Sequence, residues 1–227
     1  MNNKGLLVIG GSKGIGKSII QKELNKRQIW NISRTPIDIS EVEQIQMDIL
    51  NDELPEIDDL SSLVYCPGTI NLKPLSSLSL EDFRTDIELN VMGAVKAIKK
   101  YHRQLKKMDN ASIILFSTVA VAQGMPFHAS VATAKAAIEG LTKSLAAEFA
   151  PKIRVNCIAP TVTNTSLAAG LMRNEQAIDK LKARHPMKDI LQADEVAALA
   201  CYLMSSEARN ITGQIIHMDG GLSTLKV

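Results

Sequence analysis

Short apolar runs alternate with longer amphipathic segments from one end of the chain to the other. A short apolar run is typical of a buried parallel strand, and an amphipathic segment of about ten residues or more is typical of a helix that covers a sheet. The expected strands are Leu6–Ile9, Ile29–Ile32, Ser62–Cys66, Ser112–Phe116, Arg154–Ile158 and Gln214–Met218, with a short one at Gln44–Met47. The expected helices are Gly14–Lys26, Leu80–Lys106, Val131–Phe149 and Ala193–Ser205. The alternation predicts an α/β fold in which a doubly wound parallel β-sheet is flanked by helices.

The length and the charge balance narrow the class of protein. A chain of 227 residues, 45% of them hydrophobic, can bury one large core, so we expect residues 1–227 to form a single domain. The 26 Lys and Arg residues nearly balance the 24 Asp and Glu residues, which gives no electrostatic case for nucleic acid or an anionic membrane as a partner. The basic run from Lys99 to Lys107 recurs at helical spacing and indicates a solvated helix face. No apolar run approaches the ~20 residues that a membrane span needs.

The cysteines indicate the redox state of the cellular compartment in which the protein is expected. Cys66, Cys157 and Cys201 are widely spaced and lie in apolar runs. They indicate buried thiols in a reducing compartment, and neither a disulfide framework nor a metal site is expected. The apolar run Gly5–Ile9 is too short for the core of a signal peptide. These features predict a cytoplasmic protein.

A glycine-rich turn follows the first expected strand. Residues 10–16 read Gly-Gly-Ser-Lys-Gly-Ile-Gly and lead into an amphipathic helix. The glycines at 10, 14 and 16 permit a tight turn and a close approach of the backbone to a pyrophosphate, and the first N–H groups of the helix supply an anion site. The order of strand, glycine turn and helix is typical of a dinucleotide site on a Rossmann-type sheet.

The end of the second expected strand bears on which dinucleotide binds. An acidic residue there accepts hydrogen bonds from the ribose hydroxyls of NAD and repels a 2′-phosphate. Residues 30–34 read Trp-Asn-Ile-Ser-Arg, with no carboxylate. Arg34 offers a planar, bidentate cation to a phosphate, and Lys13 in the glycine turn can reach the same group. We therefore expect NADP(H) as the cofactor; the alternative is two solvated surface cations.

Two further segments bear on ligand binding. Asp48 follows the strand Gln44–Met47 and can either accept a hydrogen bond from the adenine amino group or cap the next turn. The stretch from Asn164 to Arg184 has a weaker helical pattern, and its place after the sixth strand lays it over the carboxyl ends of the strands. A doubly wound sheet binds its ligands there. We interpret residues 164–184 as a substrate lid, with an ordinary pair of surface helices as the alternative.

Several ordered motifs are similar to those of the short-chain dehydrogenase/reductase family, and the resemblance covers essentially the whole chain. They are Gly10-x-x-x-Gly14-x-Gly16, Asn90 within residues 89–93, the strand at residues 153–160 and the run from Ile211 to Gly221. The chain departs from the family where Ile9 replaces a threonine, where residues 65–68 read Tyr-Cys-Pro-Gly instead of Asn-Asn-Ala-Gly, and where Thr161 replaces a glycine. The segment between Asp48 and Ser62 is short, so we expect the third helix to be a turn or to be absent.

The motifs and the resemblance together yield a set of candidate cofactor-binding residues. Thr165, for example, falls where a threonine of the family contacts the nicotinamide amide or the pyrophosphate. The set comprises Gly10, Ser12, Lys13, Gly14, Ile15, Gly16, Ser33, Arg34, Asp48, Ile49, Gly68, Lys135, Pro160, Val162 and Thr165.

The resemblance also implies a catalytic arrangement, and the chain departs from it at one position. In that family a tyrosine donates the proton, a lysine four residues later lowers its pKa and holds the ribose, a serine polarises the carbonyl, and an asparagine positions a water. Lys135 matches the lysine, Asn90 the asparagine and Thr118 the serine, with one extra methyl. The position of the tyrosine holds Val131, which has no transferable proton.

A second pattern in the family offers a substitute for the missing acid. In its enoyl-thioester reductase branch the tyrosine stands seven residues before the lysine, and that position here is His128. An imidazole titrates near neutrality and can donate a proton at physiological pH. The alternative is a loop histidine at the rim of the pocket. The glycine turn follows the main branch of the family, not the wider spacing of the enoyl-reductase branch.

These observations predict an NADP(H)-dependent short-chain dehydrogenase/reductase-type oxidoreductase that transfers hydride to a carbonyl or enoyl group of a small or acyl substrate. The candidate catalytic residues are Lys135, Thr118, Asn90 and His128. The alternative is a cofactor-binding pseudoenzyme that acts as a sensor or a structural partner, since Val131 removes the usual acid. The two longest expected helices are apolar on more than one face, and members of the family pair these helices across a two-fold axis, so we expect a homotetramer or homodimer.

Overall fold

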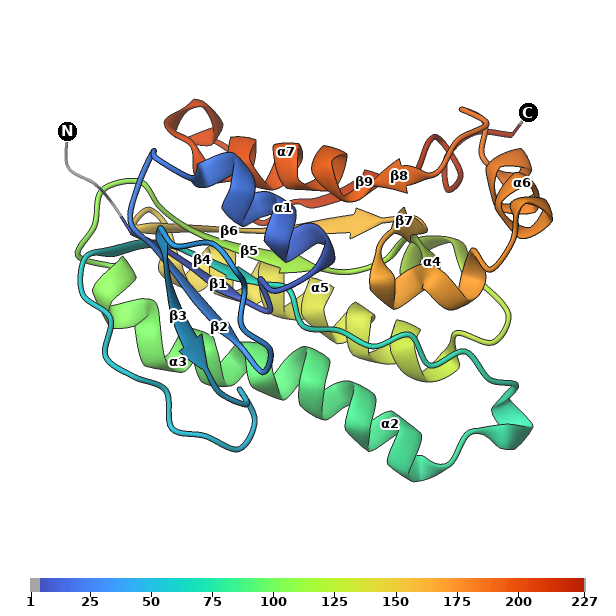
Figure 1. Cartoon of the computed structure of the whole chain (residues 1–227), viewed down its shortest axis with the longest axis horizontal. Coiled ribbons are helices and arrows are strands. Elements are labelled where there is room, and N and C mark those ends of the chain that lie inside the picture. The colour runs from blue at the N-terminus through green and yellow to red at the C-terminus, as the bar shows by residue number, and fades with distance from the viewer. Residues whose placement is uncertain (1–4, 227) are drawn as a thin grey trace.

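One parallel sheet forms the centre of the molecule (Figure 1). The computed structural model describes residues 5–226. The strands of this sheet are β1 (Gly5–Ile9), β2 (Ile29–Ser33), β3 (Val42–Gln46), β4 (Leu60–Tyr65), β5 (Ala111–Phe116), β6 (Ile153–Pro160) and β9 (Ile215–Met218). They lie in the order β3-β2-β1-β4-β5-β6-β9, and every neighbouring pair is parallel. The predicted doubly wound sheet is confirmed, and its strand order reverses between β1 and β4, where such sheets form a ligand crevice.

Helices cover both faces of the sheet. They are α1 (Gly14–Glu23), α2 (Leu80–Ile87), α3 (Gly93–Leu105), α4 (Val119–Gln123), α5 (Ala129–Phe149), α6 (Glu175–Arg184) and α7 (Ala193–Met204). Shorter turns are the π-helical η2 (Glu88–Met92) and the 3-10 turns η1 (Leu75–Ser77), η3 (Ser166–Leu171) and η4 (Ser206–Ala208). Helices α1 and α7 pack together on one face, and α3 and α5 lie on the other with α2 against α5 (Figure 1). A second, two-stranded sheet joins β7 (Thr163–Asn164) to β8 (Leu191–Gln192).

Alternate strand residues fill two separate cores. In β1, Leu6 and Val8 pack with the apolar residues of α1 and α7, whereas Leu7 and Ile9 pack with those of α3 and α5. All four side chains are at most 1% exposed. A parallel strand that is covered on both faces must be apolar on both faces, which explains why β1 is an uninterrupted apolar run.

The predicted helix Leu80–Lys106 is continuous from Leu80 to Leu105, but a π-helical turn, η2, lies between its α-helical parts α2 and α3. A π-helical turn accommodates one additional residue in the helix. Within it, the carbonyl of Leu89 accepts a hydrogen bond of 2.6 Å from the hydroxyl of Tyr65 on β4. Helical periodicity along the sequence does not report a contact with a neighbouring strand, so the π-helical turn could not be predicted from it.

Other predicted boundaries differ by a few residues. The short third strand is Val42–Gln46, not Gln44–Met47. The first helix ends at Glu23, because Leu24 has a non-helical ψ of 142°, and Asn25 follows with a positive φ of 61°. Residues 47–59 contain no helix, as expected for this short segment. The stretch 164–184 contains η3 and α6, whereas α4 is a helix that the sequence pattern did not predict. Within residues 5–226, no helix has the length and apolar character needed to span a membrane.

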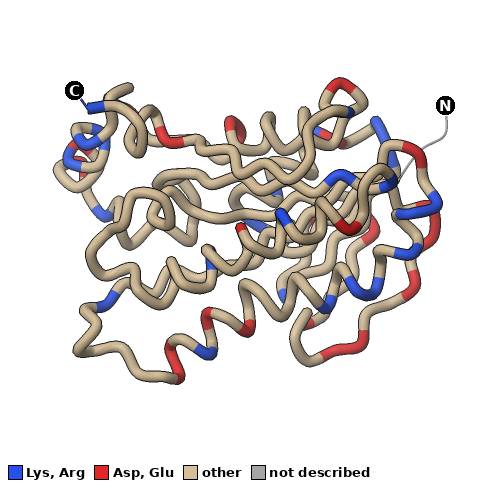
Figure 2. Tube along the Cα trace, turned by 180° about the vertical axis from the view of Figure 1, so that it is seen from behind, with Lys and Arg blue, Asp and Glu red and all other residues tan. Residues whose placement is uncertain are grey.

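Charged residues of both signs are interspersed over the molecule (Figure 2). The basic side of α3 lies beside the acidic segment that precedes β4. The Lys96 ammonium donates to the carbonyl oxygens of Leu50 and Asp52 at 3.0 and 2.7 Å, and Lys100 forms an ion pair with Glu56. The basic run therefore belongs to a helix face that is partly paired within its own chain.

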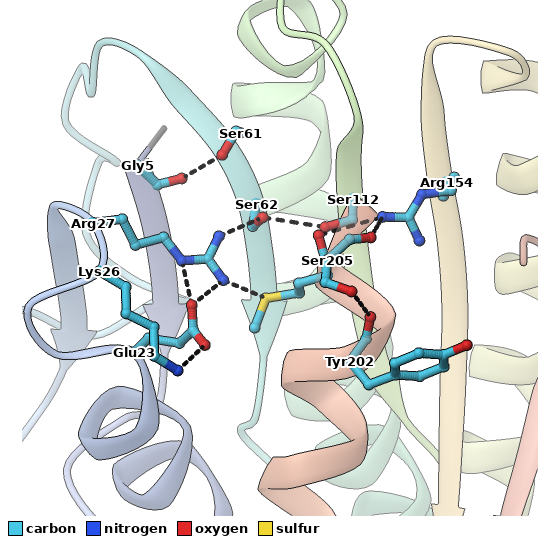
Figure 3. Close-up of polar contacts among 11 residues, drawn as sticks. Gly5, Glu23, Lys26, Arg27, Ser61, Ser62, Ser112, Arg154, Tyr202 and Ser205 are labelled. Atoms are coloured by element: carbon cyan, nitrogen blue, oxygen red, sulfur yellow. Dashed lines mark hydrogen bonds and ion pairs between the residues drawn. The ribbon is translucent and has the colours of Figure 1, made fainter. Parts of the chain in front are cut away.

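A polar network ties the helices to the amino ends of the strands (Figure 3). The Arg27 guanidinium donates to Glu23 at 2.7 Å and to the hydroxyl of Ser62 at 2.9 Å. Ser112 donates to Ser62 at 3.1 Å, and Arg154 donates to the carbonyl of Ala208 beyond α7 at 3.1 Å. These residues lie at the edge of the sheet opposite the carboxyl ends, so we interpret the network as structural.

Candidate active site

The glycine turn between β1 and α1 is held in shape by its neighbours. Gly10 has a φ of +81°, and a β-carbon there would lie 3.0 Å from Pro67. A β-carbon on Gly16 would lie 2.6 Å from the carbonyl oxygen of Gly10. The N–H of Gly11 donates to Oδ1 of Asn31 at 2.9 Å. The turn therefore requires glycine at position 10 because of its left-handed backbone, and at position 16 because a side chain would collide with the backbone of Gly10.

Asn31 is a site residue that sequence reasoning missed. Its side chain is fully buried in β2, where Oδ1 holds the glycine turn. Its amide nitrogen donates to Gln44 at 2.7 Å and to the hydroxyl of Ser33 at 3.1 Å. One amide thus ties the turn to β2 and β3. The available signal was a polar residue with apolar neighbours on both sides, which in a buried strand must find hydrogen-bond partners.

The amino end of α1 faces the same turn. Lys13 is its N-cap residue, and within the described residues neither a capping side chain nor an acidic residue occupies its first turn. The first N–H groups of such a helix are suited to bind an anion. A β-carbon on Gly14 would lie 3.1 Å from Cγ2 of Thr165, so the structure brings Thr165 against the glycine turn from far along the chain.

A cleft of about 610 Å³ lies beside the glycine turn. The candidate residues that line it are Gly10, Ser12, Lys13, Ser33, Arg34, Asp48, Ile49 and Gly68. Its other wall includes residues of α2 and η2 that sequence reasoning missed, namely Glu81, Arg84, Thr85, Glu88 and Leu89. Gly14 and Thr165 line a neighbouring hollow, together with Ser12 and Lys13. Lys13 and Arg34 are both exposed, which presents two cations to one cleft.

The contacts of Asp48 match one of its two predicted roles. Oδ1 of Asp48 accepts a hydrogen bond of 2.9 Å from the backbone N–H of Leu50. An aspartate that accepts from the N–H two residues later caps a turn. Asp48 therefore caps the turn after β3, and its carboxylate also borders the cleft.

Lys135 is buried next to Gly68 and Asn90. A β-carbon on Gly68 would lie 3.3 Å both from Nζ of Lys135 and from Oδ1 of Asn90. The ammonium donates to the carbonyl of Phe116 at 3.0 Å. Burial lowers the pKa of Lys135 to about 8, because the charged ammonium loses its hydration. The structure thus brings the candidate lysine and asparagine together at the turn that follows β4.

The end of β5 lies against α5 at the same place. The hydroxyl of Ser117 donates to Glu139 of α5 at 2.6 Å. Thr118 follows and is the N-cap residue of α4, where its Oγ1 accepts from the N–H of Ala120 at 3.4 Å. Thr118 thus follows Phe116 by two residues, and the carbonyl of Phe116 accepts the hydrogen bond of Lys135. The candidate threonine and the candidate lysine therefore both belong to the region at the end of β5.

The two candidates for the proton-donor position differ in exposure. Val131 lies one turn before Lys135 on α5 and is 5% exposed. His128 is half-buried and directly precedes α5, and its Nδ1 donates to the carbonyl of Pro126 at 2.7 Å. A carbonyl oxygen can only accept, so this bond selects the tautomer with hydrogen on Nδ1 and leaves Nε2 as the basic nitrogen of the neutral ring.

A buried hydrogen bond holds the chain directly after residues 164–184. His185 follows α6, is 2% exposed, and donates from Nδ1 to the carbonyl of Leu181 at 2.8 Å. Its Nε2 lies 2.8 Å from the hydroxyl of Thr161, which follows β6. Thr161 is the residue that departs from the glycine of the family pattern, and sequence reasoning assigned neither residue a role. The pair fastens the chain after α6 to the end of a central strand.

Comparisons with known proteins agree with this geometry. A family model described as enoyl-(acyl carrier protein) reductase matches residues 18–223. A tropinone reductase homologue from Datura stramonium is 31% identical over 241 residues, covering 95% of this chain and 90% of the relative.

Solved structures have the same architecture over nearly the whole chain. The aldohexose dehydrogenase of Thermoplasma acidophilum superposes with a TM-score of 0.90 at 27% identity, covering 99% of this chain and 95% of that one. ElxO with NADP bound superposes with a TM-score of 0.88 at 25% identity, covering 98% and 100%. With the doubly wound sheet, the glycine turn and the buried lysine already described, these matches show that the chain belongs to the short-chain dehydrogenase/reductase family.

Proposed function

We propose that this chain is an NADP(H)-dependent oxidoreductase that transfers hydride to a carbonyl or conjugated enoyl group of a small or acyl substrate. The observation that carries the proposal is the position of Gly68. It lines the large cleft and also lies against Lys135 and Asn90. One turn therefore joins a dinucleotide-sized cleft to a buried ammonium, which is the juxtaposition that a hydride-transfer site requires.

The residues of the cleft fit NADP(H). A glycine turn that excludes β-carbons, next to a helix end without an acid, suits a pyrophosphate. Arg34 and Lys13 on the same cleft suit a 2′-phosphate. ElxO, which has the same fold, binds NADP. When bound, the dinucleotide supplies the hydride.

The chain's own residues orient the reactants and handle the proton. In the proposed site Lys135 holds the nicotinamide ribose through its ammonium, and Asn90 is fixed beside it. The hydroxyl of Thr118 polarises the carbonyl of the substrate by donating a hydrogen bond. Since Val131 has no proton to give, His128 is the proposed proton donor, with water as the alternative source.

The proposal extends to the whole molecule. Residues 1–227 act as one NAD(P)-binding domain, in which residues 164–184 form a lid over the substrate. The protein acts on a small molecule in the cytoplasm, as a homotetramer or homodimer. The names of the aldohexose dehydrogenase and of the tropinone reductase homologue support substrates that interconvert a carbonyl and an alcohol.

A steady-state screen tests the proposal. Oxidation of NADPH is followed by absorbance with ketones, 3-oxoacyl thioesters and enoyl thioesters, using the wild type and Lys135→Met. We expect at least one class to be reduced by the wild type and at least tenfold more slowly by the variant, roughly the contribution of one positioned polar group. Tight NADPH binding without turnover on any class would contradict the proposal and favour the pseudoenzyme alternative, which the burial of Val131 at the acid position supports.

A further inference from the structure

An acidic side chain is buried beside the cluster around Lys135. Asp86 is 1% exposed, and it is the buried residue of α2, whose other side chains are exposed or half-buried. A carboxylate is costly to bury unless hydrogen bonds or an opposite charge compensate for its lost hydration. The reason for an acid at this position must therefore lie among its neighbours.

Thr69 links this acid to Asn90. The Thr69 hydroxyl donates to Oδ1 of Asp86 at 2.6 Å and accepts from the amide nitrogen of Asn90 at 3.1 Å. The same amide nitrogen donates to the backbone carbonyl of Asp86 at 2.8 Å. The other side-chain oxygens, Oδ2 of Asp86 and Oδ1 of Asn90, accept no hydrogen bond from residues 5–226. Asp86 and Thr69 thus hold Asn90 so that its oxygen is directed away from its own helix turn.

That oxygen faces the same small space as the ammonium of Lys135. Both atoms lie 3.3 Å from the point that a β-carbon on Gly68 would occupy. Nζ of Lys135 has three N–H groups, and one of them donates to Phe116. The acid, the threonine, the asparagine and the lysine therefore form one buried polar cluster built from α2, the turn after β4, η2 and α5.

The groups that face Lys135 from neighbouring elements differ in charge. They are Cys157 of β6, Cys66 after β4 and Asp86 of α2, and each of them, when it is an anion, raises the pKa of Lys135. Burial raises the pKa of both thiols to about 12, so they are uncharged near neutral pH. On α5 itself, Glu139 accepts the hydrogen bond of Ser117. Among the three neighbours, Asp86 is the carboxylate.

We propose that Asp86 is a positioning residue that holds Asn90 through Thr69 and places a carboxyl group in the buried cluster that contains the Lys135 ammonium. The inference rests on the proposed function, in which a protonated Lys135 holds the ribose. It adds a residue that none of the sequence motifs contains. Removal of the negative charge makes the buried ammonium less stable, so the ammonium loses its proton at a lower pH.

A direct titration of Lys135 in the full chain tests this role without requiring turnover. The side-chain resonances of Lys135 are followed by NMR against pH and assigned with Lys135→Arg. We expect a wild-type midpoint near 8. In Asp86→Asn, which keeps the size and the acceptor for Thr69, the midpoint should fall by roughly half a unit to one unit. Asp86→Val removes the same charge and suits a buried site, so it repeats the test if the amide variant folds poorly.

Two further variants separate charge from geometry. Glu148→Gln removes an exposed acid from the same helix as Lys135 and should leave its midpoint unchanged. Thr69→Val removes the hydroxyl that donates to Asp86 and accepts from Asn90, so it should lower kcat and should lower the Lys135 midpoint by no more than Asp86→Asn does. A wild-type midpoint in both neutral Asp86 variants would overturn the inference.

Kinetics distinguishes this inference from the proposed function. With an active substrate, the alkaline limb of the kcat profile should move to lower pH in Asp86→Asn by the same amount as the NMR midpoint. A shifted midpoint in a protein that reduces no substrate would support the role of Asp86 and contradict the reductase proposal. Turnover with an unshifted midpoint would support the reductase proposal and contradict the role of Asp86.

Discussion

The side chain of Tyr65 occupies the space that a β-carbon on Gly93 would need. Tyr65 reaches from the end of β4 across the start of α3, and its hydroxyl donates to the carbonyl of Leu89 at 2.6 Å. Asn90 lies within the π-helical turn between these contacts. The pairing of a tyrosine on the strand with a glycine on the helix thus lets the strand hold the turn that carries Asn90.

Replacement of Gly93 by alanine should therefore destabilise the protein. Alanine favours a helix over glycine by about 1 kcal/mol, but its β-carbon would overlap the Tyr65 hydroxyl. We expect Gly93→Ala to lower the free energy of unfolding by about 1–3 kcal/mol, measured by denaturant titration.

A matched control lies on α5. Gly140 has no described atom within 4 Å of its would-be β-carbon, so Gly140→Ala should stabilise by about 0.5–1 kcal/mol. Tyr65→Phe removes the clashing oxygen and should make Gly93→Ala less costly than it is in the wild type. Equal stabilisation by both alanine variants would contradict the described contact.

Arg34 should discriminate between the two nicotinamide dinucleotides. A charge-assisted hydrogen bond to the 2′-phosphate contributes about 1.5–3 kcal/mol, and Arg34 lines the cleft. We expect Arg34→Ala to weaken NADPH binding by about one to two orders of magnitude in calorimetry, with NADH binding nearly unchanged. Arg103→Ala, at an exposed position of α3, should change neither. Equal affinity of the wild type for NADPH and NADH would refute the expected preference.

Restoring a tyrosine at position 131 should raise ketone reduction. A positioned general acid contributes ~10²–10⁴-fold, and Val131 lies one turn before Lys135 on the same helix. We expect Val131→Tyr to increase kcat by roughly one to three orders of magnitude, with a smaller gain if the ring crowds the methyl of Thr118. The comparison is made under single-turnover conditions with saturating NADPH.

His128→Ala is the companion of that experiment. If the imidazole donates the proton, this variant should lose native turnover while its affinity for NADPH stays intact. Native turnover that survives the change would show that His128 only borders the pocket and that water supplies the proton.

The exposed apolar side chains of α2 predict self-association. Leu80 and Ile87 lie two turns apart on that helix and are 75% and 37% exposed. An apolar second face on a helix is typical of an oligomer interface. We expect a dimeric or tetrameric mass by light scattering at micromolar concentration, and a smaller mass for the double variant Leu80→Lys/Ile87→Lys. Leu167→Lys, on η3, serves as the control, and a monomeric wild type would contradict the prediction.

Sequence alone determined the architecture and two parts of the candidate site, namely the glycine turn and the position of Lys135. The alternation of apolar runs and amphipathic segments predicted the parallel sheet, because a strand that is buried on both faces is a continuous apolar run in the sequence. The glycine turn at residues 10–16 and the pair of positions 131 and 135 can also be recognised locally. A tight turn and the spacing of one helical turn each involve only a few consecutive residues. These are the features that a pattern in a short window can carry.

The tertiary structure decided which distant residues meet. Asn31 braces the glycine turn, Thr161 holds His185, and Asp86 meets Asn90 through Thr69, 17 residues away in the sequence. The π-helical turn η2 likewise lies where Tyr65 reaches from β4 to the helix. Each of these contacts requires a particular strand register and helix docking, which minimise buried unpaired polar groups over the whole chain. A short stretch of sequence does not show which distant polar groups will pair, so these contacts could be recognised only in the folded molecule.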